Sequence, residues 1–217
     1  MSTVEERVSI PLLNEPAPDF EAQTTHGPIK LSDYKGKYVV LFSHPSDFTP
    51  VCSTEFGGFA SYAEEFEKRN VQLIGLSVDS IPSHLAWIRD IEKMFDVKVN
   101  FPVIADLDMN VSKKYGMIHP GASNTATVRS VFIIDDKGIL RALIYYPMSA
   151  GRSIPEILRV IDSLQTTDKT GHTTPADWVP GDPVIVPVTT KVGAIDSEEE
   201  ARAKGLDYKS WYLRLKK

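Results

Sequence analysis

Residues 38–56 have the sequence YVVLFSHPSDFTPVCSTEF and combine a predicted strand, a short loop and the start of a predicted helix. The first six, Tyr38–Ser43, carry no charge and are rich in aromatic and β-branched side chains, which is typical of a strand buried on both faces. Thr49 followed by Pro50 is a typical helix start, because proline has no N–H to leave unpaired and its φ already suits a helix. A strand that leads into a helix in this way favours an α/β fold.

Further strands and helices follow along the chain. Apolar runs predict strands at 71–78, 101–105, 128–134 and 139–146, and periodic apolar positions predict helices at 50–70, 82–95 and 154–164. The residues between the last two strands, Asp135-Asp136-Lys137-Gly138, predict a hairpin turn. This order predicts an α/β sheet with helices on both faces, which fits a thioredoxin-like topology among other α/β topologies.

The composition changes after residue 164. Residues 165–217 contain four prolines and few apolar residues, so this segment is too poor in core residues to fold alone. We therefore predict a main domain over 1–164 and a C-terminal appendage over 165–217. The appendage is either a flexible tail or an arm that packs on a partner subunit. Trp178, Trp211 and Tyr212 favour the arm, because disordered tails are poor in aromatic residues.

The overall composition excludes several classes of protein. The chain has 217 residues, 42% of them hydrophobic, and a formal net charge of −5, so it is typical of a globular protein and lacks the basic surface that nucleic acids require. The apolar runs are too short to cross a membrane. The first ten residues hold no apolar stretch of signal-peptide length, and we expect a cytoplasmic location.

The chain has a single cysteine, Cys52. One cysteine excludes an intramolecular disulfide and every Cys-X-X-Cys motif. The five histidines are scattered without paired helical spacing, so we expect no metal site. Because no glycine-rich phosphate-binding or dinucleotide-binding motif is present, we expect no cofactor.

Cys52 is predicted in the first turn of the helix that begins at Pro50. There its sulfur lies near unpaired backbone N–H groups and the positive end of the helix dipole, which both favour a thiolate. The residues that share its helix face are apolar, so the thiol points inward: Phe56, Phe59, Ala63 and Phe66. Cys52 is then either an inert core residue or a reactive thiol. The prolines and the helix cap around it favour the reactive thiol.

Residues 43–52, with the spacing Pro45-X-X-X-Thr49-X-X-Cys52, resemble the active-site signature of the peroxiredoxins, in particular their one-cysteine branch. The resemblance covers nearly the whole chain. Residues 71–79 and 84–87 resemble the family's next strand and helix, and residues 128–135 resemble the strand that carries its active-site arginine. Residues 146–159 resemble the stretch that leads into the last core helix, and residues 177–182 the start of the C-terminal domain.

The resemblance implies a thioredoxin-like fold with a central mixed sheet, helices on both faces and a small C-terminal dimerisation domain. It implies a thiol-specific peroxidase that reduces hydrogen peroxide and organic hydroperoxides, for antioxidant defence and redox homeostasis. The cysteine becomes a sulfenic acid and an external thiol regenerates it. The implied assembly is a homodimer whose arm reaches over the partner, and a homodecamer of five dimers.

The resemblance also assigns roles to residues. Cys52 is the nucleophile, and Arg129 lies beside its sulfur, where it favours the thiolate and orients the peroxide. Thr49 caps the helix and holds a peroxide oxygen with its hydroxyl. Pro45 shields the sulfur from water.

Three more residues are candidates for support of the site. His44 either tunes the site or is a structural histidine. Glu55 and Arg152 are candidates to contact the residues that surround the sulfur, without touching the peroxide themselves. A surface salt bridge is the simpler expectation for each.

The chain departs from known relatives at two places. Residues 31–37, LSDYKGK, lack the Gly-X-Ser-X-Gly pattern of the phospholipase activity credited to some one-cysteine relatives, so we do not expect that activity. Ser210 and Arg214 lie around Trp211, where some archaeal-type relatives carry additional cysteines.

A second hypothesis, from another class, is a non-catalytic assembly or holdase protein with an inert thiol. Arg129 argues against it, because a charge on an apolar strand is costly to hold near a core without a function.

Overall fold

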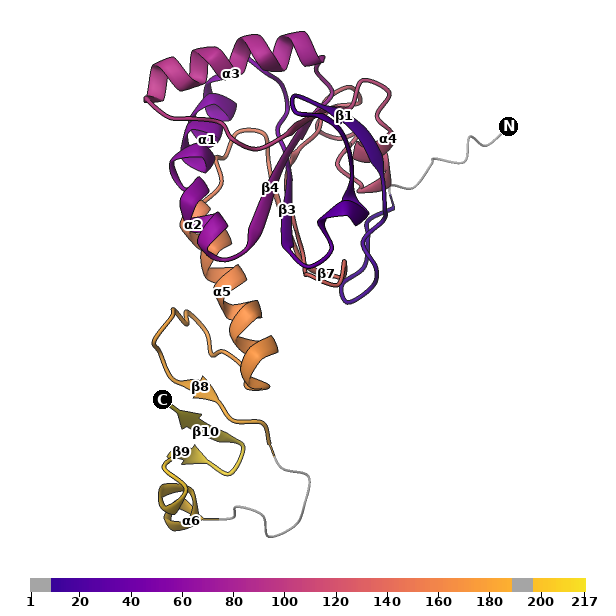
Figure 1. Cartoon of the computed structure of the whole chain (residues 1–217). Coiled ribbons are helices and arrows are strands. Elements are labelled where there is room, and N and C mark those ends of the chain that lie inside the picture. Colours follow the sequence, from indigo (N-terminus) through magenta and orange to yellow (C-terminus); the bar gives the residue numbers. More distant parts are fainter. Residues whose placement is uncertain (1–8, 189–196) are drawn as a thin grey trace, which may run out of the picture. The chain divides into compact units, whose positions relative to one another are not determined.

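The computed structural model describes residues 9–188 and 197–217 (Figure 1). The chain forms two compact units that meet in the sequence between Ile154 and Pro155, and each is described by itself. Residues 189–196 of the predicted arm lie outside the described residues. The domain boundary after residue 164 stays a prediction.

A seven-stranded mixed sheet forms the centre of the first unit. In spatial order its strands are β2 (Gly27–Lys30), β1 (Glu21–Thr24), β5 (Val103–Ala105), β4 (Val71–Ser77), β3 (Tyr38–Ser43), β6 (Arg129–Ile134) and β7 (Leu140–Tyr146). β3, β4 and β5 are parallel, while β6 runs antiparallel to β3 and β7 antiparallel to β6. The register places Phe42 opposite Gly75 of β4 and Val131 of β6.

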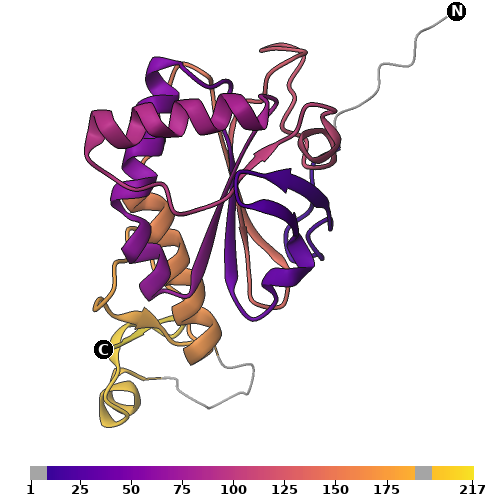
Figure 2. The ribbon, with the colours of Figure 1, turned by 45° about the horizontal axis from the view of Figure 1, so that its top comes forward.

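Helices cover both faces of this sheet, as predicted (Figures 1 and 2). On one side lie α1 (Pro50–Ser61), α2 (Ala63–Lys68) and α3 (Ile81–Phe95), and on the other lie α4 (Asn110–Lys114) and the short 3-10 helix η1 (Leu31–Tyr34).

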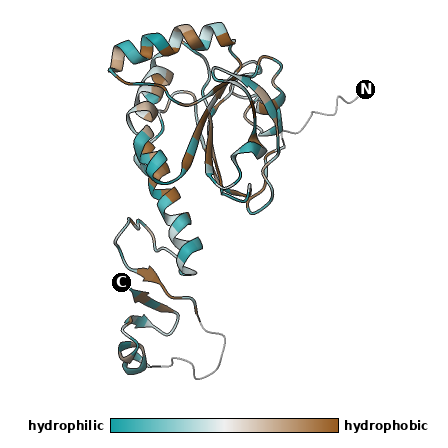
Figure 3. Ribbon diagram, in the orientation of Figure 1, coloured by the Kyte–Doolittle hydropathy of each residue, from teal (hydrophilic) through white to brown (hydrophobic). Residues whose placement is uncertain are grey.

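The core has one layer on each face of the sheet, and β3 contributes to both. Val39 and Leu41 belong to the layer that also holds residues of β4 and β6. Phe42 points to the α1 side, where its ring stacks on Phe59 at 4.0 Å between centroids. Figure 3 shows the central strands as mostly apolar, and every residue of β3 is buried. The prediction of a strand buried on both faces is confirmed.

The predicted helix over 50–70 is wrong in one respect, because it consists of two helices. The N–H of Tyr62 still bonds to the carbonyl of Gly58, but its backbone, with φ −97° and ψ 5°, leaves the helical conformation, so α1 ends there and α2 follows. The hairpin of β1 and β2 was not predicted, since its strands are only four residues long and mostly exposed. The helix predicted to end at residue 164 continues six residues further, as α5 (Ile154–Thr170).

The second unit contains most of α5, a three-stranded sheet of β8 (Val184–Ile185), β10 (Leu213–Lys216) and β9 (Asp207–Ser210), and α6 (Glu198–Ala203). Trp178 is buried and its ring N–H donates to the carbonyl of Asp182 at 3.0 Å. Trp211 and Tyr212, by contrast, are 59% and 56% exposed. In the part of the chain that the structure describes, no helix has both the length and the apolarity to cross a bilayer.

Candidate active site

Cys52 lies in the first turn of α1, as predicted. Thr49 is the N-cap, with an extended backbone, and Pro50 is the first helical residue. Cys52 is therefore the third residue of the helix, and its side chain has no exposed surface. The thiol is free, and it points inward with Phe56 and Phe59 of the same helix, which are also fully buried.

Arg129, the first residue of β6, lies beside the sulfur. Its Nη1 is 3.3 Å from Cys52 Sγ and donates to Glu55 Oε2 at 2.7 Å. Its Nε and Nη2 both donate to the carbonyl of Met148, at 2.9 and 2.7 Å. Four contacts thus fix the guanidinium in one orientation, with one edge toward the sulfur. The expected neighbourhood of Cys52 and Arg129 is present.

Glu55 and Arg152 form a buried ion pair, so the expectation of surface salt bridges is wrong. Arg152 donates to Glu55 through its backbone N–H, Nε and Nη2, and through Nη1 to the carbonyls of Ser43 and Ser130. Burial opposes the charge on Glu55, but the hydrogen bonds and charges of Arg152 and Arg129 outweigh it and hold the pKa of that carboxyl below its ordinary value. Glu55 is therefore ionised and orients Arg129.

The loop between β3 and α1 carries the other predicted residues. Pro45 is buried and Thr49 is partly exposed. The Thr49 hydroxyl does not cap the helix as predicted, because it donates to the carbonyl of Ser46 at 2.8 Å. Phe48 has a positive φ of 54° and is 56% exposed, which is an unusual conformation for a bulky residue.

The fold brings His44 together with two residues that sequence reasoning missed, Asp47 and His84. His44 Nε2 and His84 Nδ1 each donate to the Asp47 carboxylate at 2.9 Å, and all three residues are buried. Their ligand-type atoms lie within 4.8 Å of one another, as in a metal site. These atoms hydrogen-bond to each other, so their arrangement is explained without an ion. The histidines are not all scattered, contrary to the sequence analysis.

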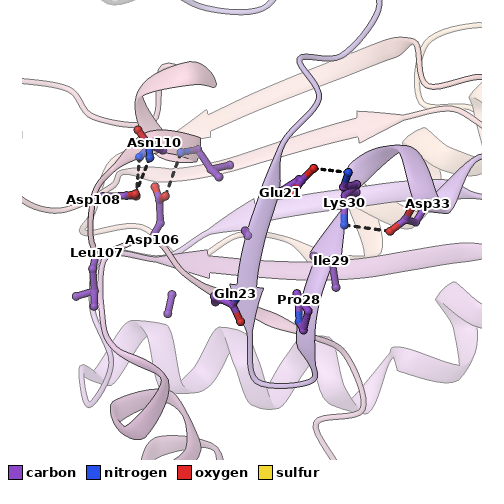
Figure 4. Close-up of a pocket in the computed structure, with 13 residues that line it drawn as sticks. Glu21, Gln23, Pro28, Ile29, Lys30, Asp33, Asp106, Leu107, Asp108 and Asn110 are labelled. Atoms are coloured by element: carbon purple, nitrogen blue, oxygen red, sulfur yellow. Dashed lines mark hydrogen bonds and ion pairs between the residues drawn. The ribbon is translucent and has the colours of Figure 1, made fainter.

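A cavity of about 730 Å³ lies elsewhere in the first unit, between the β1–β2 hairpin and the loop before α4 (Figure 4). None of the predicted site residues lines it. Its charged groups are engaged locally: Lys30 pairs with Glu21, and Asp106 accepts from the backbone N–H groups of Val111 and Ser112. The cavity is therefore separate from the cysteine site.

Comparisons with known proteins agree with this geometry. Residues 13–143 match the AhpC/TSA family, and residues 163–201 match the C-terminal domain of 1-Cys peroxiredoxin. A peroxiredoxin of Aquifex aeolicus is 55% identical over 224 residues, covering 98% of this chain and 99% of its own length. The chain belongs to the peroxiredoxin family. Another 55% identical relative, peroxiredoxin 2 of Caldanaerobacter subterraneus subsp. tengcongensis, covers 97% of this peroxiredoxin and 95% of its own length.

Solved structures confirm the fold. A yeast mitochondrial 1-Cys peroxiredoxin, described for thiol resolution via the glutathione and thioredoxin systems, has a TM-score of 0.83 at 45% identity and covers 95% of this chain and 99% of its own. A mutant of peroxiredoxin 6 from Arenicola marina has a TM-score of 0.82 at 40% identity, with coverages of 94% and 96%. The thioredoxin-like fold with a C-terminal domain is confirmed, and this peroxiredoxin is a thiol-dependent peroxidase with a single cysteine.

Proposed function

We propose that Cys52 is the peroxidatic cysteine and that Arg129 is its catalytic partner. The observation that carries this proposal is the guanidinium nitrogen 3.3 Å from a buried sulfur at the start of a helix. The thiolate attacks one peroxide oxygen, the O–O bond breaks, and the other oxygen leaves as hydroxide or alkoxide, which takes up a proton. The sulfur is oxidised to a sulfenic acid and the peroxide is reduced.

The leaving oxygen gains negative charge in the transition state, so fixed donors near it contribute most to the rate. Arg129 supplies such donors, and Glu55 and Met148 hold it in place. The Thr49 hydroxyl donates its hydrogen bond to the Ser46 carbonyl, so its lone pairs are left to accept from the peroxide O–H. Pro45 is buried in the same loop and limits access of water to the sulfur.

Regeneration requires an external thiol, because the chain has no second cysteine. A thiol attacks the sulfenic acid and releases water, and a second thiol reduces the resulting mixed disulfide. The yeast mitochondrial relative supports glutathione-type or thioredoxin-type reductants as the class to test. The first turn of α1 must open locally for such a thiol to reach the buried sulfur.

We also propose a homodimer built with the C-terminal region, and a decamer of five dimers as the larger assembly. The match of residues 163–201 to the C-terminal domain of 1-Cys peroxiredoxin supports the dimer, as do the exposed rings of Trp211 and Tyr212. Multi-angle light scattering tests both states, and a well-folded monomer contradicts them. The cytoplasmic location stays a prediction, which cell fractionation tests.

The deciding experiment for the site measures the second-order rate at which the Cys52 thiol is lost on addition of hydrogen peroxide. We expect a rate far above that of free cysteine, with one peroxide consumed per thiol and none consumed by Cys52→Ser. A rate no higher than that of free cysteine favours the holdase hypothesis and overturns the proposal.

A further inference from the structure

Asp47 is a buried carboxylate that joins the active-site loop to α3. It accepts from His44 Nε2 at 2.9 Å, from His84 Nδ1 at 2.9 Å and from the Ser83 hydroxyl at 2.8 Å. His44 follows β3 directly, whereas Ser83 and His84 lie in the first turn of α3. Asp47 therefore connects the loop to an element that is distant in the sequence.

The backbone of the same loop is held from a second side. The Asp47 N–H donates to Asp79 Oδ2 at 2.9 Å, and the Ser77 hydroxyl at the end of β4 donates to the same oxygen at 2.7 Å. The neighbouring carbonyl, that of Ser46, accepts from the Thr49 hydroxyl. The position of the Thr49 hydroxyl therefore depends on where Asp47 and Asp79 hold the loop.

The cluster is held together by hydrogen bonds on both sides of the His84 ring. Its Nδ1 faces the Asp47 carboxylate at 2.9 Å and its Nε2 faces the Ile104 carbonyl at 3.1 Å. Burial lowers the pKa of His44, which favours a neutral ring there. For Asp47, burial opposes ionisation, but hydrogen bonds from both histidines outweigh it and hold the pKa well below its usual range. The buried carboxylate is thus ionised, with both histidine rings as hydrogen-bond partners.

We propose that Asp47 and His84 are positioning residues for peroxide reduction, which fix the loop so that the Thr49 hydroxyl and Pro45 face a peroxide bound at Cys52. This inference rests on the proposed function of Cys52. Neither Asp47 nor His84 has a hydrogen bond to Cys52, Arg129 or Glu55 in the described structure. Their loss should therefore disturb the placement of peroxide more than the reactivity of the sulfur itself.

The ratio of two rates at Cys52 separates these effects. One is oxidation by hydrogen peroxide, which needs the placed loop, and the other is alkylation by iodoacetamide, which needs a reactive thiolate and access to the sulfur but no placed peroxide. In Asp47→Asn we expect the peroxide rate to fall by about 10- to 100-fold, since a small misplacement at a reaction centre costs that much. The alkylation rate should change by less than about 3-fold, because Arg129 and the helix terminus still favour the thiolate.

Matched variants make the test specific. Asp136→Asn makes the same chemical change at an exposed position and should leave both rates unchanged. Ser83→Ala removes one of the three side-chain donors to Asp47 and should lower the peroxide rate in the same direction by a smaller factor. His84→Gln removes the imidazole that bonds to Asp47 and should resemble Asp47→Asn. Circular dichroism is the check that each variant is folded.

Two results overturn the inference alone: a folded Asp47→Asn with both rates at their parental values, or an equal fall of both rates. If Asp47→Asn does not fold, a folded Ser83→Ala with the parental ratio overturns it. If the unmodified chain reacts with peroxide no faster than free cysteine does, the proposed function of Cys52 fails first, and the inference with it.

Discussion

Replacing Arg129 by alanine removes the guanidinium that contacts the sulfur. Two unit charges 3.3 Å apart interact by about 5 kcal/mol at an effective dielectric constant of 20. Glu55, 2.7 Å from the same nitrogen, cancels part of this interaction. Loss of a single aimed donor at an oxyanion costs about 10²- to 10³-fold in rate, and we expect Arg129→Ala to slow peroxide oxidation of Cys52 by that factor.

Arg129→Lys should recover only part of the rate, because lysine keeps the charge but cannot contact both Glu55 and Met148 with a planar fork. The fold should survive, since Arg152 continues to pair with Glu55 through three hydrogen bonds. The expected loss of stability is about 1–3 kcal/mol for the missing hydrogen bonds. Stopped-flow mixing with hydrogen peroxide measures the rate, and Arg89→Ala, on the exposed face of α3, is the control. A folded Arg129→Ala that reacts at the parental rate refutes the assigned role.

Three further predictions concern stability, pH and oxidation. Gly57→Ala places a methyl group 2.7 Å from the Phe95 ring, so urea denaturation should show a loss of about 1–3 kcal/mol that Phe95→Ala partly reverses; an unchanged midpoint contradicts this. Because the folded pKa of Glu55 lies below its unfolded value, its stabilisation is present above about pH 5 and is lost as the pH falls. The unfolding free energy of Glu55→Gln should therefore vary less between pH 3 and pH 6, and an identical slope argues against the pairing. Brief peroxide treatment should add one oxygen to Cys52 by mass spectrometry and excess peroxide two or three, without a covalent dimer on non-reducing gels; a dimer that dithiothreitol removes would show that two sulfurs meet.

The sequence predicted the central strands because they are buried on both faces and therefore continuously apolar. It missed the hairpin of Glu21–Thr24 and Gly27–Lys30, whose half-exposed strands carry no comparable pattern. It ended the last core helix at residue 164, where the apolar periodicity stops, although α5 continues through six polar residues to Thr170. Apolar patterning thus marks the parts of an element that are buried, while hydrogen bonding decides where the element ends.

The cysteine loop was predictable because its residues are contiguous, and Arg129 because its strand resembles a known one. The burial of Glu55 and Arg152 was not predictable, since their partners lie 97 residues apart and a salt bridge on the surface has the same sequence. His84 left one signal: it shares the inward face of α3 with Trp87 and Ile91, at helical spacing. A histidine on an apolar face needs a buried hydrogen-bond partner, and only the fold identifies Asp47 as that partner.

The proposed cycle places two opposing demands on the first turn of α1. Hydrogen peroxide must meet a sulfur that is held rigidly and away from water, whereas the thiol that follows is larger and needs the turn to open. The Ser53 hydroxyl holds the turn by donating to the Thr49 carbonyl at 2.9 Å, and it accepts from the Trp87 ring N–H at 3.1 Å. Just before the turn, Phe48 keeps a left-handed backbone, which costs about 1–2 kcal/mol for a residue with a side chain. Opening the turn for the reducing thiol therefore has to break the two hydrogen bonds that the Ser53 hydroxyl makes.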